Sequence, residues 1–329
     1  MDFAINGFGR IGRAIFRLAF NTGNRCLHIN EPNASIEDIC YFLKYDSLYG
    51  SFDADIVRCG DEVIEIRGIE KQLSVNIHHC SEVGDFVSKV PDDCVIIEAN
   101  GNHNHIDYYR KHHNKKAVFT FSSKDISNEI IFGANDSNYS PHGDLNIVSG
   151  SICDTTAIAP VLQCVYSCAS ISNTVITTMH PALGYQKVID NYVPSSMNRS
   201  LGRQYIDSII PKRTSAEDIL RRHFNRKIRC LSFRIPTESV CCADITLFSE
   251  ETIDANRVIQ SLRQCKYITF SHDDLVSIDF KASHFSATVD MRWFELLDNH
   301  LLKIVIWYDN EYGYSSRILD LMEYYYGCD

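Results

Sequence analysis

The chain has 329 residues, of which 45% are hydrophobic and 22% are charged, and its formal net charge is −10. This length favours two domains over a single core. The acidic balance argues against a general nucleic-acid or anionic-membrane binder, and no apolar run reaches the roughly 18 residues of a membrane span. The first residues pass directly into a strand pattern, so we expect no signal peptide and a cytoplasmic protein.

Cysteine usage favours a reducing compartment. The chain holds 13 cysteines, an odd number without a repeating framework, and no C-x-x-C occurs. We therefore expect free thiols and no metal site.

The first half alternates short apolar runs with amphipathic helices, which is typical of βαβ units in a parallel sheet. Strands are predicted at residues 2–6, 26–30, 95–100, 117–122, 129–134 and 145–148. Helices are predicted at residues 10–21, 36–43 and 105–113. An inserted hairpin pair is predicted at residues 61–67 and 72–79.

The second half is richer in alternating, β-branched runs and predicts a mostly antiparallel sheet. Its strands are expected at residues 175–180, 228–236, 240–248, 276–280, 286–290 and 301–308. Its helices are expected at residues 153–167, 216–223 and 253–264, and a further helix at 314–325. Residues 181–208 show little periodicity, and loops of that length are usually functional.

A glycine-rich turn follows the first predicted strand. Gly7, Gly9 and Gly12 form G-x-G-x-x-G where the strand passes into a helix. These glycines allow a tight turn, close approach of a pyrophosphate and contact between helix and strand. Glu31 ends the second strand, where a carboxylate accepts hydrogen bonds from the ribose hydroxyls and repels a 2′-phosphate. The pattern favours NAD over NADP; the alternative is a glycine-rich turn beside a solvated glutamate.

Cys153 stands where a loop of small residues gives way to a helix. Free N–H groups and the helix dipole there favour a thiolate nucleophile and can hold an oxyanion. The alternative is a packing role, because free cysteines are among the most buried residues. His180, 27 residues later, ends a predicted strand and is a candidate base or a structural histidine. Arg234 lies within an apolar strand and needs an anion, either a structural carboxylate or a substrate phosphate.

Several segments, in order along the whole chain, resemble the glyceraldehyde-3-phosphate dehydrogenase family, which includes erythrose-4-phosphate dehydrogenase. They are I-N-G-F-G-R-I-G-R (5–13), L-K-Y-D-S-x-x-G-x-F (43–52), I-V-S-x-x-x-C (147–153), F-R-I-P-T (233–237) and W-Y-D-N-E-Y-G-Y-S (307–315). The family also keeps the same spacing between cysteine and histidine.

The resemblance implies a role for each matching residue. Cys153 is implied as the nucleophile and His180 as the base. The NAD-contacting positions it implies are Gly7, Gly9, Arg10, Ile11, Gly12, Glu31, Thr120 and Asn310. The substrate-contacting positions are Arg234, Thr214, Arg203 and Asp154. The loop after His180 resembles the family's S-loop, which lies at a tetramer interface, so a homotetramer is implied.

The combined prediction is an α/β protein with an N-terminal Rossmann parallel sheet and a mostly antiparallel α+β catalytic domain. We expect an NAD-binding domain at 1–149, a catalytic domain at 150–312, and a C-terminal helix at 313–329 that packs back on the NAD domain. The expected activity is NAD-dependent oxidation of an aldehyde phosphate through a cysteine thioester, as in glycolysis.

The phosphate site departs from the family pattern. Ile152 and Asp154 replace a serine and a threonine that help to hold phosphate, while Leu183 and Tyr185 replace a threonine and an aspartate. At an effective dielectric of ~20, a carboxylate about 6 Å from an anion gives roughly 3 kcal/mol of repulsion per unit charge. Asp154 would therefore weaken phosphate attack and raise the cysteine pKa, unless its side chain points to solvent as an ordinary residue of a first helical turn.

Beside Thr214 the chain has two cations, Lys212 and Arg213, that are added relative to the family pattern.

Two other functions stay open. One is release of the acid by hydrolysis, as in the erythrose-4-phosphate branch; the other is an NAD-binding paralogue with a regulatory role.

Overall fold

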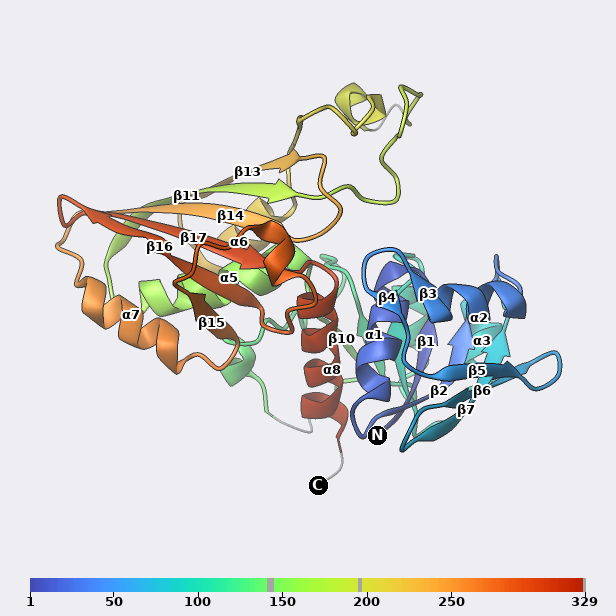
Figure 1. Ribbon diagram of the computed structural model, residues 1–329. Helices are drawn as coiled ribbons and strands as arrows, with labels where there is room; N and C mark the ends of the chain where they lie inside the picture. The colour runs from blue at the N-terminus through green and yellow to red at the C-terminus, as the bar shows by residue number, and fades with distance from the viewer. Residues whose placement is uncertain (141–144, 195–196, 328–329) are drawn as a thin grey trace. The chain divides into compact units, whose positions relative to one another are not determined.

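Figure 1 shows the computed structural model, which describes residues 1–140, 145–194 and 197–327. The chain divides into two compact units. Unit 1 comprises Met1–Ile130, Asn135–Ile152 and Ser315–Asp329. Unit 2 comprises Ile131–Ala134 and Cys153–Tyr314. The C-terminal segment thus belongs with the N-terminal half of the chain.

Unit 1 is built on one sheet. Over the described residues its strands are β1 (Asp2–Asn6), β2 (Arg25–Asn30), β5 (Asp55–Arg58), β6 (Val63–Arg67), β7 (Gln72–His78), β8 (Val95–Glu98), β9 (Ala117–Phe119) and β10 (Ile147–Ser149). The strand order is β10-β9-β8-β1-β2-β7-β6-β5. Pairing is parallel from β10 to β7 and antiparallel in the hairpins of β5, β6 and β7. The six parallel strands have the order of a Rossmann fold, as predicted.

Helices flank this sheet, and three of them lie at predicted positions. The helices are α1 (Arg10–Phe20), α2 (Ile36–Lys44), α3 (Val83–Val87) and α4 (His105–Lys111), with a short 3-10 helix η1 (Asp136–Asn138). A small ladder of β3 (Tyr45–Asp46) and β4 (Gly50–Ser51) follows α2. Ser35 and Asp38 form a capping box that fixes the start of α2. Helix α8 (Tyr312–Tyr326) ends the described chain.

Unit 2 is built on a second sheet. Its described strands are β11 (Ile171–His180), β12 (Ile210–Lys212), β13 (Ile228–Arg234), β14 (Cys241–Ser249), β15 (Ile268–Ser271), β16 (Ala287–Leu297) and β17 (Leu301–Tyr308). The strand order is β12-β13-β11-β14-β17-β16-β15. The β11–β13 and β15–β16 pairs are parallel and the other four are antiparallel. The predicted mostly antiparallel sheet is confirmed.

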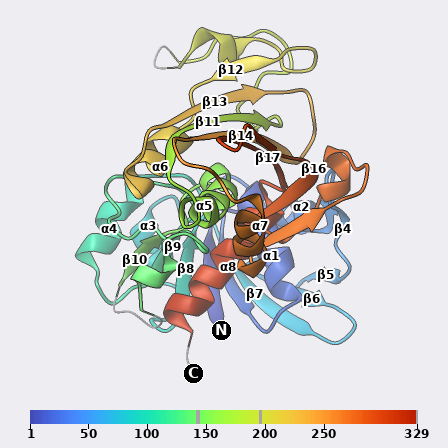
Figure 2. The ribbon, with the colours of Figure 1, turned by 90° about the vertical axis from the view of Figure 1, so that its left-hand side faces the viewer.

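Three helices lie along one face of this sheet (Figures 1 and 2). They are α5 (Cys153–Tyr166), α6 (Ala216–Phe224) and α7 (Ala255–Gln264). Side chains that alternate along β11, such as Thr174 and Ile176, are buried, while Val175 between them is 46% exposed. The segment between β11 and β12 holds the 3-10 helix η2 (Arg199–Gly202) and extends past the β12 edge (Figure 2).

One predicted strand of the first half is wrong. Residues 129–134 form a single bridge between Glu129 and Ser149, followed by a turn. Gly133 has φ +76°, and the N–H of Ala134 donates to the carbonyl of Ile131. The apolar residues of this run are buried in the turn rather than in a ladder, and a short apolar run does not distinguish these outcomes.

A second predicted strand, residues 276–280, is also wrong. It is the 3-10 helix η3 (Ser277–Phe280). Asp279 accepts a hydrogen bond from the N–H of Val276 at 2.8 Å, and only Phe280 is buried, stacked on Trp307. The local bond of the aspartate outweighs the alternating pattern. Strands β5, β12 and β15 and helix α3 were not predicted, and β16 extends seven residues beyond the predicted end at residue 290.

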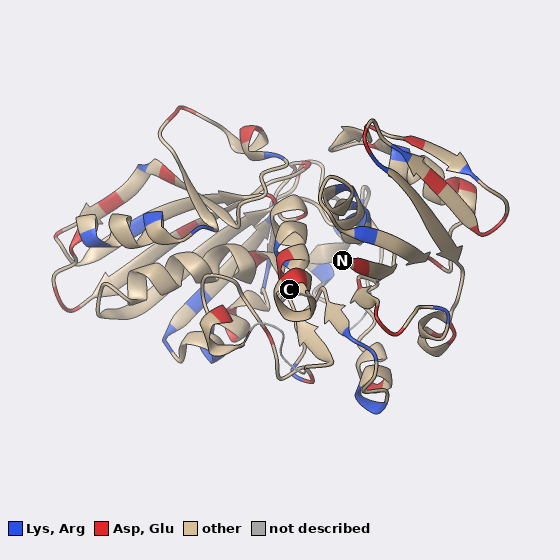
Figure 3. Ribbon diagram, turned by 90° about the horizontal axis from the view of Figure 1, so that it is seen from below, with Lys and Arg blue, Asp and Glu red and all other residues tan. Residues whose placement is uncertain are grey.

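Charged residues of both signs are interspersed along the two units (Figure 3). The cysteines among the described residues are free thiols. None of the described helices combines the length and apolar character needed to cross a membrane.

Candidate active site and cofactor pocket

The glycine-rich turn of unit 1 has the geometry of a phosphate cradle. Gly7 has φ +100°, and a Cβ on Gly12 would lie 2.2 Å from the carbonyl oxygen of Gly7. A Cβ on Gly9 would meet no described atom within 4 Å, so this glycine leaves open space in front of the first turn of α1. Gly9 is also the N-cap of α1 and makes no side-chain cap. Open space at an uncapped helix N-terminus fits a pyrophosphate.

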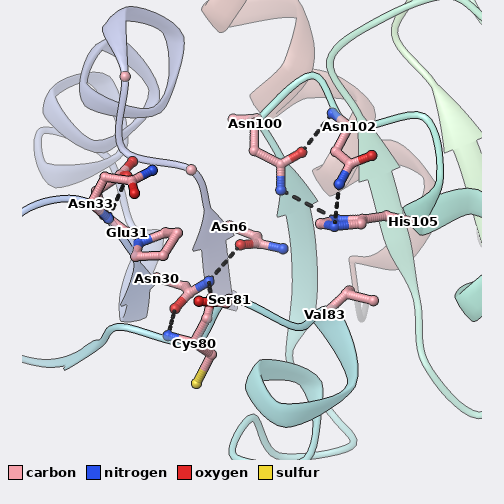
Figure 4. A pocket seen from close by; sticks show the side chains of 14 residues that line it. Asn6, Asn30, Glu31, Asn33, Cys80, Ser81, Val83, Asn100, Asn102 and His105 are labelled. Carbon is pink, nitrogen blue, oxygen red and sulfur yellow. Dashed lines mark hydrogen bonds between the residues drawn. The ribbon is translucent and has the colours of Figure 1, made fainter.

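Glu31 lies at the end of β2 and lines a pocket with Gly7, Gly9 and a ring of asparagines (Figure 4). Its Oε2 accepts a hydrogen bond from the N–H of Phe8 at 3.0 Å, which holds the carboxylate beside the glycine turn. A carboxylate at this edge of the sheet is placed for a ribose. The residues of unit 1 thus fit a dinucleotide, as the sequence predicted from glycine spacing.

Sequence reasoning missed a buried network behind this pocket. Glu98, at the end of β8, is fully buried and accepts hydrogen bonds from Asn6 at 2.9 Å and Tyr109 at 2.7 Å. Its other oxygen lies 3.0 Å from Nδ1 of His105 and 3.1 Å from the amide of Asn100. A glutamate within the apolar run V-I-I-E was the available signal, because a buried carboxylate requires such partners. The network thus holds Asn6, Asn100 and His105, which line the pocket (Figure 4).

The other predicted cofactor residues have distinct surroundings. The Arg10 guanidinium lies 2.5 Å from Asp46, and Ile11 is half-buried in the first turn of α1. Thr120 follows β9 and donates from both its N–H and its hydroxyl to the Glu98 carbonyl at 3.1 Å. Asn310 belongs to unit 2, in the turn after β17 that the Asp309 side chain stabilises.

Cys153 and His180 are brought together in unit 2. Cys153 is the first residue of α5 and His180 the last residue of β11. The Cys153 Sγ lies 3.8 Å from Nε2 of His180. Nδ1 of His180 lies 2.8 Å from the carbonyl oxygen of Pro181, so Nδ1 carries the proton and Nε2 presents a lone pair to sulfur. This is the arrangement of a nucleophile with its base.

The surroundings of both groups disfavour their charged forms. Burial raises the pKa of the Cys153 thiol and the Asp154 charge raises it further; Arg234 and the Asp154 backbone N–H lower it by less. The predicted effect of the helix N-terminus is therefore present but outweighed. Burial lowers the pKa of His180 to about 4 despite the opposing charge of Asp154. The histidine is thus a free base that can accept the thiol proton.

Asp154 faces this pair and not the solvent. It is 4% exposed, and its Oδ1 lies 3.8 Å from Sγ of Cys153. The Tyr308 hydroxyl donates to Oδ1 at 2.9 Å, and the Thr214 hydroxyl donates to Oδ2 at 3.3 Å. Of the two orientations open from sequence, the structure has the one that faces the site. Tyr308 belongs to the W-Y-D-N segment, but its contact with Asp154 could not be deduced without the fold.

The predicted substrate residues are only partly assembled. Arg234 ends β13 directly beside His180 in the strand register, and its side chain is 6% exposed. Thr214 joins the cluster through Asp154. The Arg203 guanidinium instead forms an exposed ion pair with Asp190, 2.8 Å away, in the segment after β11.

A Rossmann sheet with a dinucleotide pocket, joined to a unit with a cysteine–histidine pair, defines an NAD-dependent oxidoreductase. Two family models match the chain. The glyceraldehyde 3-phosphate dehydrogenase NAD binding domain matches residues 1–106 and the C-terminal domain of the same enzyme matches residues 152–310. The chain belongs to the glyceraldehyde-3-phosphate dehydrogenase family, and NAD is its cofactor.

Relatives that carry the name of this enzyme align with nearly the full length of the chain. The cytosolic glyceraldehyde-3-phosphate dehydrogenase of Chondrus crispus is 32% identical over 331 residues, covering 97% of this chain and 96% of the relative. The enzyme of Echinococcus multilocularis is 30% identical over 342 residues, with 99% and 98% covered. The testis-specific enzyme of Rattus norvegicus is 28% identical over 336 residues, with 98% and 76% covered.

Proposed function

We propose that this chain oxidises an aldehyde phosphate through a covalent intermediate on Cys153, as glyceraldehyde-3-phosphate dehydrogenases do. The observation that carries the proposal is the 3.8 Å approach of Sγ to the unprotonated Nε2 of His180. A thiol that lies beside a neutral imidazole can lose its proton as sulfur adds to a carbonyl.

The chain's own groups account for the proton transfers. His180 accepts the thiol proton as the S–C bond forms and returns it to the carbonyl oxygen, which gives a thiohemiacetal. His180 then takes the hydroxyl proton while hydride leaves the carbon, and a thioester remains on Cys153. Bound NAD supplies the acceptor for that hydride, and Gly7, Gly9 and Glu31 are the residues that would hold it.

A second outcome, hydrolysis of the thioester, is favoured by Asp154. Its carboxylate lies next to sulfur, where an attacking phosphate dianion would meet like charge. The Thr214 hydroxyl is already donated to Asp154, and Ile152 offers no side-chain donor. Water carries no charge and escapes the repulsion. Phosphorolysis of glyceraldehyde 3-phosphate remains the first candidate because family membership supports it.

The test is NADH formation with glyceraldehyde 3-phosphate or erythrose 4-phosphate, each with and without inorganic phosphate. Phosphate-dependent turnover supports phosphorolysis, and turnover that ignores phosphate supports hydrolysis. Asp154→Thr, which restores a hydroxyl, should lower the KM for phosphate. If calorimetry shows that NAD binds but neither aldehyde is oxidised, the enzyme proposal is overturned. The alternative of an NAD-binding paralogue with a regulatory role would then be supported.

The proposal includes a homotetramer in the cytoplasm. The sheet face of unit 2 opposite its helices exposes apolar side chains, namely Val175, Leu231 and Phe248. Apolar side chains gathered on one sheet face are typical of a subunit interface. The free thiols of the described residues, and the relative that is named as cytosolic, support a cytoplasmic location.

A further inference from the structure

Three strand ends bring a set of polar side chains to one corner of the unit 2 sheet. His180 and Arg234 are register partners at the ends of parallel β11 and β13. Lys212, at the end of β12, lies opposite Ser232. Ser232 and Arg234 are two residues apart, so their side chains point to the same face. Lys212, Arg234 and His180 therefore share this face, and the charges of Arg234 and Lys212 both act on His180.

Arg234 is buried, and no described residue forms an ion pair with it. Its side chain is 6% exposed, and its Nε and Nη1 have no hydrogen-bond partner among the described residues. Buried guanidinium donors without an acceptor are costly unless a ligand satisfies them. The nearby carboxylate of Asp154 is instead bonded to Tyr308 and Thr214. The free donors of Arg234 thus indicate an anionic ligand.

Lys212 adds a second cation to this corner. Its ammonium donates to the Tyr185 hydroxyl at 2.9 Å and lies 5.1 Å from the centre of that ring. The described residues provide Lys212 and Arg234 with no ion-pair partner. Burial raises the pKa of Tyr185, but the hydrogen bond from Lys212 and the charge of Arg234 outweigh it, so the pKa is lowered. The phenol therefore lies between two cations.

We propose that Lys212, Tyr185 and Arg234 form the subsite that holds the phosphate group of the aldehyde substrate. This inference rests on the proposed function and adds two specificity-determining residues to it. Two cations and a phenol provide the charge and the donor geometry that a phosphomonoester requires.

The first test compares Lys212→Met with Arg213→Met, a neighbouring and exposed cation, as matched control. Lys212→Met should raise the KM for glyceraldehyde 3-phosphate about tenfold or more, because it removes a charged hydrogen-bond donor. The ratio of kcat/KM for glyceraldehyde 3-phosphate to kcat/KM for unphosphorylated glyceraldehyde should fall in Lys212→Met and stay the same in Arg213→Met. Lys212→Arg should keep the KM within a few-fold, and Tyr185→Phe should raise it by less than Lys212→Met. An equal KM in Lys212→Met and Arg213→Met would overturn the proposal.

A second test needs no turnover and so separates failure of this subsite from failure of the proposed function. Glycerol 3-phosphate, with glycerol as neutral control, should slow alkylation of Cys153 by iodoacetamide, and Lys212→Met should weaken that protection about tenfold. Inorganic phosphate carries the same charged oxygens, so Lys212→Met should weaken its protection as well. If Lys212→Met weakens protection by inorganic phosphate alone, the subsite holds the free anion and the proposal fails. Undiminished protection by glycerol 3-phosphate in Lys212→Met also overturns it.

Discussion

Asp154 sets the charge environment of the cysteine–histidine pair. Its carboxylate adjoins sulfur and is fixed by hydroxyl donors from Tyr308 and Thr214. Burial and this charge together raise the pKa of the Cys153 thiol, while burial lowers the pKa of His180 to about 4. These two shifts favour the thiol over the thiolate and the neutral imidazole over the imidazolium.

Replacing Asp154 with asparagine should make Cys153 more reactive. Removal of a negative charge beside a thiolate lowers the thiol pKa, so the pH profile of iodoacetamide alkylation should move to lower pH. One pKa unit corresponds to about tenfold more thiolate at pH values well below the pKa. The measurement is the alkylation rate of Cys153 by peptide mass spectrometry across pH.

Asp244→Asn is the matched control, since Asp244 is paired with Lys303 at 2.7 Å on β14 of the same unit. It should leave the profile of Cys153 unchanged. A profile that moves equally in both variants, or in neither, would refute the role given to Asp154.

At the scale of elements, sequence patterns predicted most of the parallel sheet and its helices. The strand before the glycine turn and the helix after it follow from burial pattern and glycine spacing. The 276–280 strand failed because the Asp279 side chain bonds locally. Strand β12 has three residues and contains Pro211, which argues against a strand, and β15 has only four residues.

The glycine turn allows a paired test of folding against cofactor binding. Gly12→Ala should lower the free energy of unfolding by about 1–3 kcal/mol, because its Cβ would overlap the Gly7 carbonyl. Gly9→Ala should keep the parent's free energy of unfolding, because its Cβ would enter open space. The same Cβ should weaken NAD binding. Thermal unfolding and calorimetry with NAD measure the two effects. Equal unfolding of the two variants would contradict the packing given to Gly12.

At the scale of the whole molecule, the sequence predicted a cofactor-binding unit and a unit with the cysteine–histidine pair. It did not predict the contacts that surround that pair. Glycine spacing indicated a dinucleotide turn, and the family resemblance implied the pairing of Cys153 with His180. The buried orientation of Asp154, the Glu98 network and the Lys212–Tyr185 contact depend on residues distant in sequence. Hydrophobic periodicity in the sequence does not predict such contacts, because they form only after the strands have paired in their register.

The exposed apolar sheet face of unit 2 predicts that charged substitutions there will dissociate the proposed tetramer. Leu231→Lys with Phe248→Lys places cations on that face and should lower the molar mass from that of the proposed tetramer, measured by light scattering after size exclusion. Ile69→Lys, at a 94% exposed residue of unit 1, is the control and should leave the mass unchanged. A parent protein that is monomeric at micromolar concentration would contradict the tetramer.

The most direct test is capture of the covalent intermediate. The enzyme is mixed with NAD and glyceraldehyde 3-phosphate in phosphate-free buffer, quenched with acid within the first turnover, and mapped by peptide mass spectrometry. We predict a phosphoglyceroyl thioester on Cys153, NADH equal in amount to that thioester, and neither product in Cys153→Ser. NADH formed by the Cys153→Ser variant, or an acyl group on another cysteine, would contradict the assignment of Cys153 as the nucleophile.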